Sequence, residues 1–129
     1  MALDQYHHGV RVVEVSTGTR PIRTVATSII GLIAISDDAD ATAFPLDTPV
    51  LLTNVQAGIA KAGTEGTLRQ SLQSIADQVN TMVVVVRVAK AETPEEQTSL
   101  VIGTTTAEGK YTGLKALLTA KSTLGVKPR

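Results

Sequence analysis

The stretch "MVVVVRV", residues 82–88, decides the fold of this chain. Four consecutive valines are β-branched, and β-branched side chains favour an extended backbone over a helix. A strand with one face in solvent alternates apolar and polar residues, whereas this run is apolar at nearly every position. We therefore predict a strand in a central position of a sheet, too apolar to lie at an edge.

Two further strands are predicted upstream of this run. The segment "TSIIGLIAIS" (27–36) is an almost continuous apolar run of strand length, which indicates a strand buried on both faces. The segment "VLLT" (50–53) is a second, shorter strand. Between them, "DDADATAFPLDTP" (37–49) combines acidic residues, small residues and two prolines, a composition typical of a loop.

Helix signals separate the second strand from the valine run. Asn54 can cap a helix over 55–62, and Gly63 can end it in the left-handed conformation. Thr67 and Gln70 have the spacing of a capping box, in which each side chain bonds the other residue's backbone N–H. The segment after Thr67 carries one apolar stripe at helical spacing, formed by Leu68, Leu72, Ile75, Ala76 and Val79.

Two more helices are predicted after the valine run. Thr93, Pro94 and Glu96 form a helix start, with a capping hydroxyl, a fixed φ in the first turn and a reciprocal acid. Gly103 ends this helix. A last helix is predicted over 112–125, with its leucines mostly on one side: Leu114, Leu117, Leu118 and Leu124.

Alternating strands and helices predict an α/β fold, with an open, mostly parallel sheet, flanking helices and right-handed crossovers. We divide the chain into an extended N-terminal β-arm, residues 1–22, and an α/β domain, residues 23–129. The last helix ends at Gly125, and "VKPR" follows where another buried strand is expected. We therefore expect an incomplete domain that continues beyond residue 129 in a full protein.

Composition excludes several classes of protein. The formal net charge is zero and the basic residues are scattered, which argues against a nucleic-acid surface. The absence of cysteine excludes disulfides and thiolate metal sites. No run of about 18 apolar residues is present, so no membrane partner is expected.

Motifs that resemble chemical sites fail in their details. In "GTTTAEGKY" (103–111), five residues separate Gly103 from Gly109, whereas a phosphate loop needs four, and Tyr111 follows Lys110 where a Ser or Thr belongs. Asp38 and Asp40 have the spacing of a calcium loop, but the position of the turn glycine holds Ala43. We interpret both segments as solvent loops.

The two histidines, His7 and His8, also make a poor site. Side chains of adjacent residues in an extended segment point to opposite faces, so the pair cannot easily chelate one metal ion. No two acids have a recognisable acid–base arrangement. We predict that the chain is not an enzyme and has no catalytic residues, cofactor or metal site.

The N-terminal arm contains the one segment with a suggested role in binding. It is rich in β-branched residues but has no hairpin partner, and Pro21 marks its end. The strand can join the edge of its own sheet, or it can add to a sheet in another subunit, and periodicity alone leaves both open. The predicted strand consists of Gly9, Val10, Arg11, Val12, Val13, Glu14, Val15 and Ser16.

Four blocks of the chain resemble one protein family. They are "YHHGVRVVEVSTGTR", "DADATAFPLDTPVLLTNVQAGIAKAG", "GTLRQSLQSIADQ" and "GKYTGLKALL…GVKPR", which together cover nearly the whole chain in order. They are similar to the N-terminal part of contractile tail sheath proteins of temperate myophages, and more distantly to R-type pyocin sheaths.

This resemblance implies a structural role. Sheath subunits form stacked hexameric rings in a helical stack around a tail tube, and contraction drives the tube through the host envelope during genome delivery. The implied partners are other copies of the chain, the tail tube protein, and baseplate and tail terminator proteins. The implied location is the tail of the virion, assembled in the host cytoplasm. Residues 9–16 match the arm that pairs with neighbouring subunits.

Two other classes of function are alternatives to the sheath. A small nucleotide- or flavin-binding enzyme needs a glycine-rich loop after a strand, whereas "NVQ" follows "VLLT". A free-standing adaptor or regulatory domain, with the arm folded onto its own sheet, is the alternative that the sequence leaves open.

Overall fold

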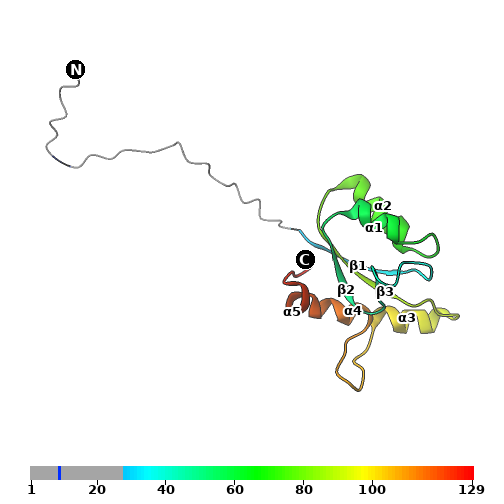
Figure 1. Cartoon of the computed structure of the whole chain (residues 1–129). Helices are drawn as coiled ribbons and strands as arrows, with labels where there is room; N and C mark the ends of the chain where they lie inside the picture. Colours follow the sequence, from blue (N-terminus) through cyan, green and yellow to red (C-terminus); the bar gives the residue numbers. More distant parts are fainter. Residues whose placement is uncertain (1–8, 10–27) are drawn as a thin grey trace.

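A computed structural model describes residue 9 and residues 28–129 of the chain. These residues form a three-stranded sheet with helices on both faces (Figure 1). The strands are β1 (Ile30–Ile35), β2 (Pro49–Leu52) and β3 (Val83–Val88). The helices are α1 (Val55–Lys61), α2 (Leu68–Gln78), α3 (Pro94–Ile102), α4 (Gly113–Ala116), the 3₁₀ turn η1 (Leu117–Thr119) and α5 (Ala120–Leu124). The strands and helices predicted after the arm are therefore present, with ends shifted by one to three residues. The exception is the last predicted helix (112–125), which is divided into α4, η1 and α5 because the backbone tightens to a 3₁₀ turn at Leu117–Thr119.

The valine run forms the centre of the sheet, as predicted. The strand order is β1-β3-β2, and all six residues of β3 are buried. Val83 and Val85 pack in one hydrophobic core with Val55, Leu68 and other residues of α1 and α2. The alternate residues of β3 face the layer formed by α4, η1 and α5, which contacts β3 and β2.

The sheet is mixed, so the prediction of a mostly parallel sheet is not confirmed. β1 runs parallel to β3, whereas β2 runs antiparallel to it. The reason is that two packed helices connect β2 to β3. The first, α1, leads away from the end of β2, and α2 leads back to that same end, where β3 begins. Leu52, the last residue of β2, consequently pairs with Val83, the first residue of β3.

β1 is an edge strand of this sheet, so the prediction that it is buried on both faces is wrong. Only Ala34 of its six residues is fully buried, and its isoleucines are half-buried. The reason is the insertion of β3 between β1 and β2, which leaves β1 with a strand partner on one side among the described residues.

The predicted loop between β1 and β2 contributes to the core. Phe44 is 1% exposed and joins the cluster under α1 and α2 together with Ala39. The backbone N–H of Phe44 donates to the Asp40 carbonyl at 2.8 Å, which forms a turn that directs the ring inward. Burial of an aromatic ring contributes about 2–3 kcal/mol, so this segment helps to stabilise the fold.

Two of the three predicted helix caps are confirmed. The Asn54 side chain accepts hydrogen bonds from the backbone N–H groups of Gln56 and Ala57, and the Thr93 hydroxyl accepts one from Glu96. The capping box at Thr67 is wrong, because this hydroxyl makes no cap hydrogen bond. It accepts instead from the backbone N–H of Ile35 at 3.2 Å, and so connects the start of α2 to the end of β1.

Candidate functional site

The predicted arm strand, Gly9 to Ser16, lies outside the described residues except for its first member. Gly9 is exposed and has a φ of +119°. The arm therefore stays a prediction, as does its pairing with another subunit. His7 and His8 lie outside the described residues too.

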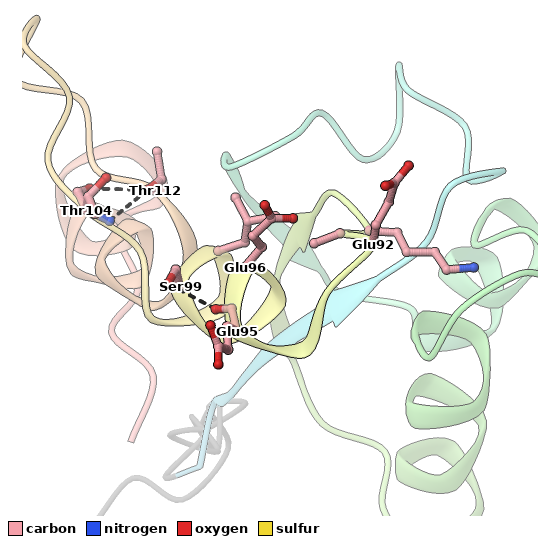
Figure 2. A pocket seen from close by; sticks show the side chains of 9 residues that line it. Glu92, Glu95, Glu96, Ser99, Thr104 and Thr112 are labelled. Atoms are coloured by element: carbon pink, nitrogen blue, oxygen red, sulfur yellow. Dashed lines mark hydrogen bonds between the residues drawn. The ribbon is translucent and has the colours of Figure 1, made fainter.

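A groove lies beside α3. Its volume is about 740 Å³, within the range of about 300–1,000 Å³ common for ligand sites. It lies between the segment after β3, the exposed side of α3, and the base of the hairpin that joins α3 to α4 (Figure 2). Its walls include Lys90, Glu92, Glu95, Glu96 and Leu100.

Local hydrogen bonds fix the shape of this groove. The Gln97 side chain accepts from the Ala91 backbone N–H at 2.8 Å and donates to the Ala89 carbonyl at 3.2 Å. These bonds hold the segment after β3 against α3. On the other side, Thr112 Oγ1 accepts from the backbone N–H of Thr104 at 2.9 Å, which closes the base of the hairpin.

The arrangement of side chains in the groove does not resemble a catalytic centre. Figure 2 shows the carboxylates of Glu92, Glu95 and Glu96 pointing in different directions. The Ser99 hydroxyl donates to the Glu95 carbonyl at 3.1 Å, so no basic side chain activates it there. No three His, Cys, Asp or Glu side chains of residues 9 and 28–129 are grouped to hold a metal ion. The groove is lined by three glutamates, one lysine (Lys90) and the apolar Ala91 and Leu100, so it is acidic on balance, which suits a protein contact.

Asp38 and Asp40, which have the spacing of a calcium loop, have structural roles. Asp38 Oδ2 accepts hydrogen bonds from the backbone N–H of Thr64 at 2.7 Å and from its hydroxyl at 2.9 Å, and Oδ1 accepts from the Glu65 N–H at 2.9 Å. These bonds, those from the backbone first, lower the pKa of Asp38 from 3.8 to about 2. Asp40 accepts from the Thr42 N–H, which lowers its pKa too. Asp38 thus joins the loop after β1 to the turn between α1 and α2.

Residues 103–111, the segment that resembles a phosphate loop, form a small hairpin. Thr105 and Tyr111 form an antiparallel bridge, and the Gly109 N–H donates to the Thr106 carbonyl at 2.9 Å. The backbone N–H groups of Thr106, Gly109 and Lys110 thus donate within this hairpin.

Sequence reasoning missed Arg87, the one charged residue of β3. Its side chain is 7% exposed, and its Nη1 donates to the Ser36 carbonyl at 3.0 Å. Its Nε has no hydrogen-bond partner among residues 9 and 28–129. The arginine in "VVVVRV" was the available signal, because a charge inside a central strand is costly to bury and therefore noteworthy.

No helix in residues 28–129 is long and apolar enough to cross a membrane.

Comparisons with known proteins agree on one family. Residues 27–88 match the family model "Tail sheath protein Gp18 domain III N-terminal region", and this match ends at the last residue of β3. The chain is 53% identical to the tail sheath protein of Escherichia phage P2, over 98% of the chain and 34% of that protein. It is 50% identical to the major tail sheath protein of Serratia phage KSP20, over 98% of the chain and 33% of that protein.

A third relative is more distant. The chain is 40% identical to a putative prophage major tail sheath protein of Pseudomonas aeruginosa (strain UCBPP-PA14), over 96% of the chain and 32% of that protein. The chain therefore spans about a third of the length of these relatives. The sequence resemblance noted above is confirmed, and the chain belongs to the family of phage tail sheath proteins.

Proposed function

We propose that this chain is a structural subunit of a contractile phage tail sheath, which polymerises around the tail tube and contracts to drive the tube through the host envelope. The observation that carries the proposal is the 53% identity to the tail sheath protein of Escherichia phage P2 over 98% of the chain. The relatives are named for a structural component of the tail, so the proposed location is the virion tail, after assembly in the host cytoplasm.

The proposed partners are other copies of the chain, arranged in hexameric rings and a helical stack, together with the tail tube, baseplate and tail terminator proteins. In this proposal residues 9–16 leave their own domain and add a strand to a sheet of another copy. Backbone ladder bonds suit this task, because they hold an added strand without requiring particular side chains. Such a connection can persist while subunits rotate about the linker that follows the arm.

The proposed role requires no catalysis, cofactor or metal ion. The hydrogen bonds of Ser99 in the groove beside α3 and of Asp38 are made to the backbone of the same chain, which supports a structural role for these side chains. A stoichiometric metal ion or nucleotide in the purified protein would contradict this part of the proposal.

A proline substitution in the arm tests the assembly role. Val12→Pro removes a ladder donor and a β-branched side chain, and Val12→Thr is the matched control because it keeps both features. We expect Val12→Pro to abolish rings or tubes in negative-stain micrographs while the melting temperature of the domain changes little.

Two results would argue against the arm proposal. If Val12→Pro lowers the melting temperature of the domain as well as abolishing assembly, the arm belongs to its own sheet, as in the adaptor alternative. Compact monomers of the unsubstituted chain, with no rings or tubes, would favour that same alternative.

A further inference from the structure

The exposed apolar side chains of this molecule are concentrated in one layer. Five of the seven large apolar side chains that residues 28–129 expose lie between residues 100 and 118: Leu100, Ile102, Tyr111, Leu114 and Leu118. This layer, formed by α3, the hairpin, α4 and η1, lies across the sheet from α1 and α2 (Figure 1). Exposed apolar side chains on neighbouring elements favour a protein contact.

Leu114 and Leu118 form the ridge of this layer. They are 52% and 72% exposed, and their spacing of four residues makes them neighbours on one helical surface. The opposite side of the same helical run carries Gly113, Ala116 and Ala120, which are buried. Small residues thus bring the helix close to the sheet, and the leucines point away from it.

The ridge is held firmly in place. Gly113 has a φ of +53°, and a Cβ at this position would lie 2.6 Å from the Val101 carbonyl oxygen at the end of α3. The Gly113 N–H donates to Asp47 Oδ1 at 3.0 Å, which ties the ridge to the loop before β2. A fixed ridge loses little conformational freedom on binding, so it is suited to a contact.

Charge is segregated on this layer. Residues 91–108 contain four glutamates and no basic residue, whereas residues 109–129 contain five basic residues and no acidic one. The groove beside α3 combines Glu92, Glu95 and Glu96 with Leu100 and one basic residue, Lys90, so its lining is acidic on balance. The ridge combines its two leucines with the exposed Lys115 and Lys121.

We infer that the basic leucine ridge (Leu114, Lys115, Leu118 and Lys121) of one copy docks in the acidic groove (Glu92, Glu95, Glu96 and Leu100) of another copy. The two surfaces complement each other in charge, and each supplies apolar area. Because ridge and groove are different surfaces of one chain, the contact is heterologous and builds rings or helical stacks. The inference rests on the proposed sheath function, which places many copies side by side.

Paired charge reversals test this contact. One variant carries Lys115→Glu with Lys121→Glu, and the other carries Glu95→Lys with Glu96→Lys. Each variant alone sets like charges against each other, so we expect self-association to weaken about tenfold or more, as measured by analytical ultracentrifugation. An equimolar mixture restores opposite charges and should recover association. Lys127→Glu with Glu65→Lys is the control outside both surfaces.

The outcomes decide between this inference and the arm proposal. Charge variants that associate normally, a mixture that does not recover, or an unsubstituted chain that stays monomeric would overturn the inference. If Val12→Pro abolishes assembly while the charge variants do not affect it, the sheath proposal stands and the ridge contact fails. If Leu118→Ser lowers the melting temperature of the monomer, the ridge is covered within its own chain and the inference is wrong.

Discussion

Asp38 connects two segments that are distant in the sequence. Its carboxylate accepts hydrogen bonds from Thr64 and Glu65, in the turn between α1 and α2. Gly63, with a φ of +74°, makes this approach possible, because a Cβ there would lie 2.6 Å from Asp38 Cγ. The aspartate is therefore a structural acceptor for backbone N–H groups.

The low pKa of Asp38 makes the stability of the domain depend on pH. Its pKa is about 2 in the folded chain and 3.8 in the reference state, so the charged form favours folding. This contribution is present above pH 3.8 and is lost as the pH falls towards 2. We expect Asp38→Asn to lower the melting temperature at pH 7, and the difference from the unsubstituted chain to shrink at pH 2.

Thermal melting followed by circular dichroism across this pH range measures the effect. Asp37→Asn is a matched control, since it removes an adjacent exposed carboxylate. A melting difference for Asp38→Asn that stays constant from pH 7 to pH 2 would show that the carboxylate charge has no such role.

At the scale of elements, two glycines between α3 and α4 distinguish the cost of a left-handed backbone from the cost of a steric clash. Gly113 and Gly109 both have positive φ, +53° and +81°, but only Gly113 is in close contact, with the carbonyls of α3. A left-handed alanine costs about 1–2 kcal/mol by itself. We expect Gly109→Ala to lower the free energy of unfolding by about 1 kcal/mol and Gly113→Ala by about 2–4 kcal/mol.

Urea denaturation of the two alanine variants tests this difference. The physical reason for the larger loss at Gly113 is the clash with the end of α3, which forces the two helices apart. Equal losses at the two positions would mean that the junction between α3 and α4 is loose, and would weaken the argument for a fixed ridge.

At the scale of the whole molecule, stability is distributed unevenly between the two faces of the sheet. All residues of β3 are buried, and α1 and α2 cover one large core. α3 has no buried residue at all. Segments with few buried contacts open at low free-energy cost, so we expect backbone amides of α3 to exchange at least about 100-fold faster than those of β3.

Hydrogen–deuterium exchange of the monomer and of the assembled protein measures this contrast. If another copy docks in the groove beside α3, its amides should become protected on assembly while those of β3 change little. Protection of α3 equal to that of β3 in the monomer would show that the molecule unfolds as one unit.

Most elements of residues 28–129 and the central place of β3 can be predicted from the sequence alone, although the last predicted helix is divided into α4, η1 and α5. These features depend on neighbours within a few residues: four valines in succession, Asn54 and Thr93 at helix starts, Gly63 and Gly103 after helix ends. It also carried the family resemblance, because similarity over the whole chain needs no knowledge of contacts. Each of these signals is local or linear, and each can be seen without the fold.

The tertiary structure alone decided which groups meet. It set the antiparallel direction of β2, the edge position of β1, the burial of Phe44 and the exposure of Leu114 and Leu118. Thr67 illustrates the reason. Its spacing to Gln70 favours a capping box, but the Ile35 N–H lies 32 residues away in sequence and takes the hydroxyl instead. Competition between local and distant hydrogen-bond partners is settled only when the chain has folded.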